Sequence, residues 1–321
     1  RPDTRGTHGW PGFPSTLDPM PLLSRLGHVL SRNRTPYLLL LPSVVYLVGF
    51  TIYPILNVFY LSLTDLHLVK SLVPKFIGLQ NFRDLIWNDA DFRRIVVNTF
   101  IWTFGSTALQ FVLGLATGLI LNARLPWRGF WRGIMLVPWV TPIVVVGIIW
   151  RWIYDGSYGL LNYYLTTLGV LNRYVVWLGE DWSVWPAILL ASLWKGYPYM
   201  CLMLLAGLQT IPQDVYEAAD VDGATGFRRL WYVTLPLLKP VAAIVTLVAL
   251  VLTWNNFQMI WVLTEGGPAY ATSVLATYVY TKGFVFFQLG SGSAVATLSI
   301  LVILVVCVIY ARMTRLEERE S

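Results

Sequence analysis

The chain has 321 residues, of which 56% are hydrophobic and only 12% are charged, and its formal net charge is +6. Soluble globular proteins contain about 25% charged residues, so this composition excludes an ordinary soluble enzyme and predicts a membrane protein. The positive charge does not indicate nucleic-acid binding, because no basic stripe with interleaved aromatic residues lies outside the apolar segments.

Residues 1–36 are rich in Pro, Gly and Arg, and we expect a poorly ordered cytoplasmic lead-in without a cleavable signal. Six apolar segments follow, each long enough to cross a hydrocarbon core of about 30 Å as a helix. They are residues 35–64, 95–123, 133–150, 186–208, 240–264 and 283–311, and only the fourth contains a charge, Lys195. The segments lack the alternation of barrel strands, so the sequence predicts an all-α, polytopic membrane protein with a six-helix transmembrane domain over 37–311.

Six crossings place both ends of the chain on the same side of the membrane. The segments on the N-terminal side hold about twice as many Lys and Arg residues as the loops on the other side. This bias predicts that the N-terminus and the C-terminal tail, residues 312–321, are cytoplasmic.

The apolar segments carry few groups that could perform chemistry. His8, His28 and His67 all precede the second segment, so a serine and a histidine cannot meet within the bundle. The sequence contains neither H-E-x-x-H nor G-x-x-x-x-G-K-[ST], and no segment has a central acid. Cys201 and Cys307 have no metal-ligand or disulfide spacing and are expected to be small core residues. We therefore expect no catalytic residue, metal or cofactor in this chain, which leaves a channel or a transporter; an intramembrane hydrolase has almost no support.

Polar and aromatic residues inside the fourth and fifth segments are candidates for a substrate pathway. Lys195 is expected near mid-bilayer, and Trp254, Gln258 and Trp261 would share one helical face. Aromatic rings and amides suit a sugar, which offers C–H surfaces to stack and hydroxyls to bond. The candidates are Lys195, Trp194, Tyr197, Trp254, Asn255, Asn256 and Gln258. The alternatives stay open, since a lysine can snorkel or fix a helix contact, amides can bridge helices, and tryptophans can form an interfacial belt.

One polar stretch, residues 212–236, interrupts the apolar chain between the fourth and fifth segments, and we call it the polar hairpin. Pro212 suits a first helical turn, and Asp214 with Glu217 has the spacing of a capping box. Gly223 is expected to stop the first helix and reverse the chain. A second helical stretch then carries Phe227, Leu230 and Trp231. An ordinary solvated loop remains the alternative.

The polar hairpin resembles the EAA signature of the permease subunits of bacterial binding-protein-dependent ABC importers. The residues that carry the resemblance are Glu217, Ala218, Ala219, Asp222, Gly223, Ala224 and the run Val233 to Pro236, which includes Leu235. Other stretches resemble the carbohydrate branch of that family: "FIGLQNF" at 76–82, "VNTF" at 97–100, "LVPWVTP" at 136–142, "IIWRWIY" at 148–154, "GLLN" at 159–162, "LAGLQTIP" at 205–212 and "VLTEGGPAYAT" at 262–272.

The resemblance implies a type I ABC importer permease fold in the bacterial cytoplasmic (inner) membrane, with carbohydrate as substrate. It implies a second permease subunit, two copies of an ATPase that binds ATP and Mg²⁺, and an extracytoplasmic solute-binding protein. Residues 209–239 would then form the loop that couples to the ATPase, and Gly266, Gly267 and Pro268 are candidates for receiving the binding protein, although they can equally be simple turns. The rival function is a secondary transporter or channel that works without ATP.

Overall fold

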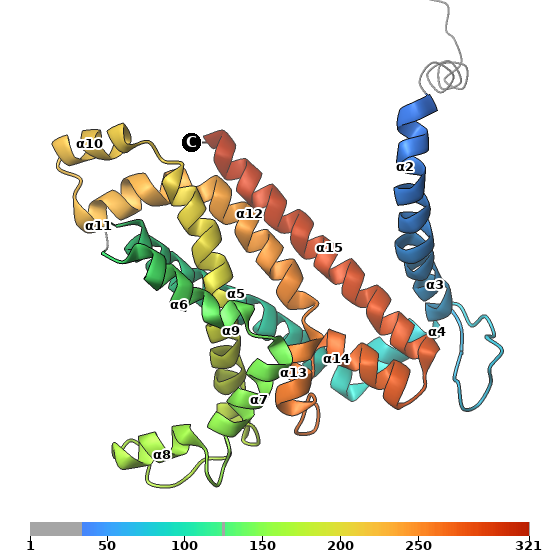
Figure 1. The fold of residues 1–321 in the computed structure, drawn as a ribbon. Helices are drawn as coiled ribbons and strands as arrows, with labels where there is room; N and C mark the ends of the chain where they lie inside the picture. Colours follow the sequence, from blue (N-terminus) through green and yellow to red (C-terminus); the bar gives the residue numbers. More distant parts are fainter. Residues whose placement is uncertain (1–33, 124–125, 321) are drawn as a thin grey trace, which may run out of the picture. The chain divides into compact units, whose positions relative to one another are not determined.

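The structure, a computed structural model, describes residues 34–123 and 126–320, which form helices and loops without a β-sheet (Figure 1). The predicted lead-in lies outside the described residues, apart from residues 34–36. The chain divides into two units, residues 1–56 and 57–321.

The first unit contains helix α2 (Arg34–Leu47), the π-helical turn η1 (Val48–Ile52) and the start of α3 (Tyr53–Ser62). These elements belong to an apolar helical stretch, Tyr37–Ser62, in which every residue over 37–56 is exposed. An apolar helix without a buried face is suited to lipid or to another membrane helix as its surroundings.

The second unit holds the remaining helices and short π-helical turns (η). In chain order they are α4 (Gln80–Arg83), η2 (Asp84–Asn88), α5 (Ala90–Asn122), α6 (Arg128–Val140), α7 (Ile143–Ile153), α8 (Leu160–Thr167), α9 (Asp181–Gln209), α10 (Gln213–Val221), α11 (Gly226–Arg229), η3 (Leu230–Thr234), α12 (Leu235–Trp254), α13 (Phe257–Thr264), α14 (Leu275–Tyr280), η4 (Thr281–Val285) and α15 (Leu289–Glu320).

Helices α5 and α9 form the central pair, packed more extensively than any other two elements. Gly114 on α5 allows this approach, since a Cβ atom there would lie only 2.5 Å from the Cβ of Met200, and Gly118 follows one turn later on the same helix. In a membrane the hydrophobic effect does not drive helices together, and small residues at this spacing let the helices pack closely enough to associate. Helices α6 and α12 also pack against this pair, so α5 and α9 form the axis of the bundle.

Five helices of the described chain are long and apolar enough to cross a membrane, and a bent pair, α6 and α7, can supply a sixth crossing. This confirms the all-α, polytopic fold. The third crossing differs in shape from its prediction as a single helix over 133–150, because α6 and α7 meet at 90°. Thr141 and Pro142 between them have extended backbones with ψ of 129° and 137°, and Pro142 has no N–H with which to continue the helix.

The fifth crossing is displaced from its predicted position at 240–264. Its helix runs over Gly226–Trp254, so it begins inside the polar hairpin and ends earlier than expected. The chain passes Pro236 without a break because the wide turn η3 precedes it, in which the N–H of Leu235 bonds the carbonyl of Leu230, five residues back. A separate helix, α13, begins after Asn255 and Asn256.

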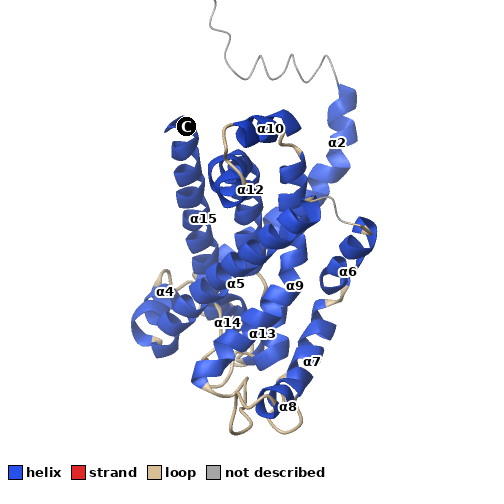
Figure 2. Ribbon diagram, turned by 90° about the vertical axis from the view of Figure 1, so that its left-hand side faces the viewer, coloured by secondary structure: helices blue, strands red, loops and turns tan. Residues whose placement is uncertain are grey.

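The second unit has two distinct ends, which both views show (Figures 1 and 2). Helix α10 and the C-terminal end of α15 lie at one end, which we call the hairpin end. Helices α8 and α13 lie at the other, which we call the distal end. The crossings run between these two ends, so each end gathers loops from several parts of the sequence.

Candidate functional site

The polar hairpin is a structured turn of two helical arms. Its first arm, α10, ends at Gly223, whose φ of +77° lies in the left-handed region that glycine favours. The N–H of Ala224 bonds the carbonyl of Ala219, and the N–H of Gly223 bonds that of Asp220, which together form a Schellman motif. The predicted stop at Gly223 is confirmed. The predicted capping box is wrong, because Pro212 precedes the first turn without a side-chain cap and Asp214 lies inside it.

A short brace joins the two arms of the polar hairpin. The Arg229 guanidinium lies 3.0 Å from a carboxylate oxygen of Asp220 and 5.5 Å from the ring centroid of Tyr216. Asp220 and Arg229 are both well exposed, so this pair adds little to the free energy of unfolding. The pair joins α10 to α11 within the hairpin.

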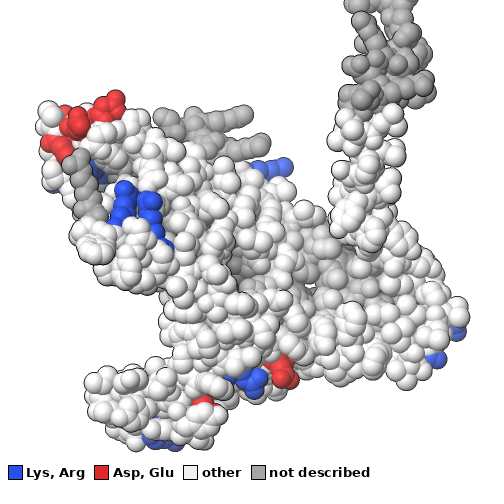
Figure 3. Space-filling view, viewed as in Figure 1, with Lys and Arg blue, Asp and Glu red and all other residues white. Residues whose placement is uncertain are grey.

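The exposed surface of the hairpin combines acidic, small and apolar side chains. Acidic side chains gather over α10 in the view of Figure 3. Among the residues that carry the family resemblance, Ala219 is buried, and Ala224 and Leu235 are half-buried. The exposed ones are Glu217, Ala218, Asp222, Gly223 and Pro236. The large apolar residues Val221, Phe227 and Tyr232 are 88%, 73% and 78% exposed. An exposed patch of this kind, rimmed by charges, is typical of a protein-binding surface.

The structure separates the candidate pathway residues of the fifth crossing. The helix break at Asn255 and Asn256 places Trp254 and Gln258 on different helices, so the single face predicted for them with Trp261 is wrong. Trp254 is only 1% exposed, and its indole N–H donates to the Ser299 hydroxyl at 2.9 Å.

The amides around the same break differ from Trp254. The Asn256 side chain accepts from the N–H of Met259 at 3.2 Å and begins α13 as its N-cap. Asn255 and Gln258 are exposed, and the Asn255 amide bonds the Val251 carbonyl. Asn255 and Gln258 therefore remain available to a ligand or to a second subunit.

The candidates on α9 lie against the bent third crossing. The Lys195 ammonium bonds backbone carbonyls where α6 ends. The Trp194 ring packs against Trp150 of α7, with centroids 6.2 Å apart, and Tyr197 packs against a cluster that contains Met135 of α6. These three side chains therefore contact both halves of the bent crossing.

The loop between α13 and α14, which contains Gly266, Gly267 and Pro268, is held by Asn98, a residue of the distant helix α5. The Asn98 side chain on α5 donates to the carbonyls of Tyr270, Ala271 and Ser273 at 3.2, 3.0 and 3.1 Å. Two stretches quoted for their family resemblance, "VNTF" and "VLTEGGPAYAT", thus meet in space. The two stretches lie more than 170 residues apart in the sequence, so no local sequence pattern could have predicted this contact.

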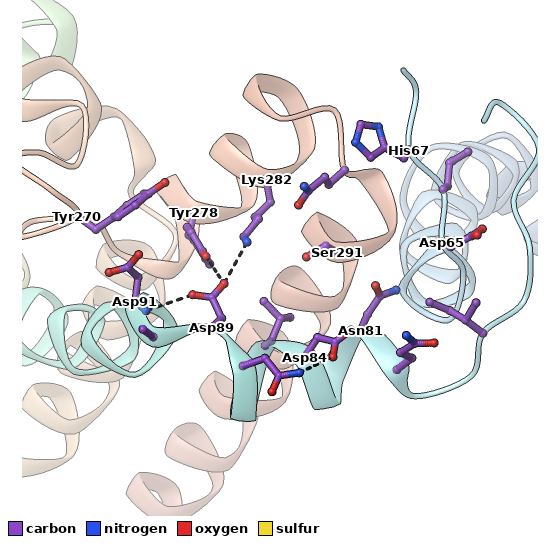
Figure 4. A pocket seen from close by; sticks show the side chains of 17 residues that line it. Asp65, His67, Asn81, Asp84, Asp89, Asp91, Tyr270, Tyr278, Lys282 and Ser291 are labelled. Carbon is purple, nitrogen blue, oxygen red and sulfur yellow. Dashed lines mark hydrogen bonds and ion pairs between the residues drawn. The ribbon is translucent and has the colours of Figure 1, made fainter. Parts of the chain in front are cut away.

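The distal end also holds a polar cleft of about 600 Å³, which we call the distal cleft (Figure 4). Its walls come from the loop before α4, from α4 and η2, from α14 and η4, and from the start of α15. At its centre the Asp89 carboxylate accepts a hydrogen bond from the Tyr278 hydroxyl and lies 3.0 Å from the Lys282 ammonium. Asp89 is also the N-cap of α5, since it accepts from the N–H groups of Asp91 and Phe92.

Electrostatics in the distal cleft favour the ionised form of Asp89. Burial alone would raise the pKa of this carboxyl, but the hydrogen bond from Tyr278 and the ammonium of Lys282 lower it below its ordinary value of 3.8. Burial and the neighbouring carboxylate raise the pKa of Tyr278 above its ordinary value of 10.0. At neutral pH Asp89 is therefore ionised and Tyr278 protonated, which are the states that their hydrogen bond requires. Through Asp89, the start of α5 contacts both α14 and η4, and we call this set of contacts the Asp89 joint.

Among the described residues, no three His, Cys, Asp or Glu side chains are placed to share a metal ion. Cys201 on α9 is buried, and Cys307 on α15 is half-buried.

Comparison with known proteins identifies the relatives of this chain. Residues 110–320 match the family described as binding-protein-dependent transport system inner membrane component. The trehalose/maltose transport system permease protein MalF of Thermococcus litoralis is 39% identical over 287 residues, which cover 87% of this chain and 93% of that protein. The sulfoquinovosyl glycerol transport system permease protein SmoG of Agrobacterium fabrum is 35% identical, over 88% of this chain and 90% of that protein.

A solved structure shares the fold. The crystal structure of a bacterial ABC transporter involved in the import of the acidic polysaccharide alginate matches with a TM-score of 0.76 at 24% identity, over 91% of this chain and 98% of the matched chain. This likeness supports the helical permease architecture predicted from the sequence.

Proposed function

This chain belongs to the family of binding-protein-dependent transport system inner membrane components, and from that premise we propose that it is one permease subunit of an ATP-driven importer for a carbohydrate. Six crossings form half of a translocation pathway, so a second permease subunit completes it. An extracytoplasmic solute-binding protein delivers the substrate, and two copies of a separate ATPase bind ATP and Mg²⁺. This subunit contributes the pathway and the mechanical link, and performs no bond chemistry.

The observation that carries the proposal is the continuous helix over Gly226–Trp254. It starts in the exposed polar hairpin and ends at the break before α13, so a displacement of the hairpin is carried through the bundle to its distal half. Conformational changes in transporters commonly move whole helices about short hinges, and here the break at Asn255 and Asn256 can serve as such a hinge. The Schellman motif at Gly223 and the exposed Glu217 and Ala218 support the polar hairpin as the surface that the ATPase grips.

The substrate class follows from the relatives. Those named for trehalose or maltose and for sulfoquinovosyl glycerol both handle carbohydrate-containing solutes, which supports a sugar or polyol derivative here. The exposed amides of Asn255 and Gln258 are the candidates for sugar contacts that solvent reaches most freely, and Trp194, Tyr197 and Asn256, which are half-buried, stay candidates as well. We propose that the fixed loop at Gly266, Gly267 and Pro268 faces the extracytoplasmic side and receives the binding protein.

The test compares two glycines with the same backbone geometry at opposite ends of the bundle. Gly223 and Gly169 have φ of +77° and +72°, and a Cβ atom at either would meet nothing within 4 Å. We expect Gly223→Asp to abolish ATP-dependent uptake of labelled maltose or trehalose in proteoliposomes while the subunit still inserts. Gly169→Asp, in the loop after α8, places the same strain and charge away from the hairpin and should keep uptake near the unmodified level.

Copurification decides the mechanism independently of the sugar. We expect an ATPase to copurify with the unmodified chain in stoichiometric amount. Uptake driven by an ion gradient without any ATPase partner would instead identify a secondary transporter or channel. Normal uptake by the Gly223→Asp variant would exclude the polar hairpin as the coupling element.

A further inference from the structure

The break between α6 and α7 leaves backbone carbonyls without helical partners. In a continuous helix the N–H of residue 142 would bond the carbonyl of Pro138, but Pro142 has no N–H. The extended Thr141 and Pro142 then carry the chain out of α6. Carbonyls left unpaired within a bilayer are costly because no water is present to bond them. The break therefore needs a donor from another part of the protein.

Lys195 of α9 supplies that donor. Its ammonium bonds the carbonyls of Pro138, Trp139 and Thr141 at 3.2, 2.5 and 2.8 Å. An ammonium group has three donors, and all three are used here. The positive charge also lies at the carboxyl end of α6, where the helix dipole favours a cation. In this arrangement Lys195 has no donor left for a substrate hydroxyl.

The residues beside Lys195 hold both halves of the bent crossing. Trp194 contacts Trp150 of α7, and Tyr199 lies 6.5 Å, between ring centroids, from Trp139 of α6. The segment 194–199 of α9 therefore contacts the crossing on each side of the break.

Helix α7 is in turn joined to α13. A Cβ atom at Gly147 would lie 2.4 Å from a methyl carbon of Val262, and the Arg151 guanidinium bonds the carbonyl of Val262 at 3.3 Å. Helix α7, which follows the first break, is thus in direct contact with α13, the helix beyond the second break at Asn255 and Asn256.

We propose that Lys195 is a positioning residue, which pins the break between α6 and α7 and thereby sets the orientation of the α7–α13 pair, without contacting the transported substrate. This inference rests on the proposed function only for its effect on uptake, because the pinned geometry is a property of the chain itself. Lys195 acts through the carbonyls that it caps.

The test measures amide hydrogen exchange over residues 137–146 in the purified, membrane-embedded assembly of the full chain. Removing the charged donor in Lys195→Met is expected to speed exchange there at least about tenfold, since hydrogen bonds to charged groups are among the stronger ones. Lys195→Arg, with several guanidinium donors, should restore slow exchange and uptake. Ser192→Ala is the matched control, because it removes one side-chain bond to Gln110 one turn earlier on α9 and leaves the break untouched.

The outcomes distinguish a Lys195 that stabilises the break between α6 and α7 from a Lys195 with another role. Exchange that is equally slow in Lys195→Met and in the unmodified chain would overturn the proposal, as would fast exchange that Lys195→Arg does not suppress. If Lys195→Met does not accumulate in the membrane, Lys195→Gln, which keeps two donors, must show a smaller acceleration confined to the same residues. Exchange does not require transport, so a missing ATPase partner would refute the proposed function and leave this measurement unaffected.

Discussion

Asp89 shows how one carboxylate can join three elements. It caps α5, accepts a hydrogen bond from Tyr278 on α14 and pairs with Lys282 on η4. Asp89 and Lys282 are only 14% and 18% exposed, so water screens their attraction weakly. We expect Asp89→Asn to lower the free energy of unfolding by about 1–3 kcal/mol, because Lys282 then keeps a buried charge without its partner. Thermal unfolding in detergent, followed by circular dichroism, measures the loss.

The pH dependence of this loss follows from the lowered pKa of Asp89. Its pKa in the folded protein is below the ordinary 3.8, so the ionised carboxylate stabilises the fold at any pH above that value. The stabilisation disappears only as the pH falls further, through the folded-state pKa. The free energy of unfolding should therefore differ between the unmodified chain and Asp89→Asn by the same amount at about pH 7 and at about pH 5. The control is Asp91→Asn, which lines the same cleft but leaves the joint intact. An equal loss in both variants would refute the role assigned to Asp89.

At the scale of elements, the contact between α5 and α9 depends more on Gly114 than on Gly118, one turn later. A Cβ atom at Gly114 would lie 2.5 Å from the Met200 Cβ and 2.9 Å from the backbone nitrogen of Cys201, which cannot move aside without shifting α9. At Gly118 the nearest atom would be an ordinary 3.5 Å away. We expect Gly114→Ala to cost about 1–3 kcal/mol in unfolding free energy through overpacking, and Gly118→Ala to be nearly neutral. Comparable unfolding midpoints for the two variants would contradict this packing.

Local patterns in the sequence predicted the elements that local forces decide. Gly223 is predicted to stop the helix because a left-handed turn favours a residue without a Cβ, and its φ of +77° confirms this. The number of crossings followed from the absence of charge, since any helix in a bilayer must be apolar. Asn256 also carried a local signal, as a good N-cap, that would have placed the second helix break.

The breaks and clamps that depend on distant residues could not be predicted in the same way. Several prolines lie within apolar helices, including Pro186, Pro198 and Pro240, but among the described residues only Pro142 coincides with a break between two halves of a crossing. At that break the ammonium of Lys195, more than 50 residues away, bonds the carbonyls that the break exposes. The burial of Trp254 against Ser299 and the clamp from Asn98 to the 270–273 loop likewise need the tertiary structure.

At the scale of the whole molecule, charge is arranged by position along the bundle. On the face that Figure 3 shows, charged side chains of the second unit gather towards its two ends and leave a broad uncharged belt between them. Hydrocarbon excludes ionised groups, so this belt marks the part of the surface that lipid or other membrane helices cover. Lys195, a charged residue in the middle part of a crossing, is consistent with this because its ammonium bonds backbone carbonyls of the protein.

The orientation of this bundle gives the final prediction, since an ATPase in the cytosol can grip the polar hairpin only if the hairpin end is cytoplasmic. Val221 in the hairpin is 88% exposed, and Leu168 at the distal end is 74% exposed. In a chain whose Cys201 and Cys307 are replaced by Ala, a membrane-impermeant maleimide should label a Leu168→Cys variant in intact cells. It should label a Val221→Cys variant only after the membrane is permeabilised. Labelling of Val221→Cys in intact cells would place the hairpin outside and remove any route by which a cytosolic ATPase could move the helix over Gly226–Trp254.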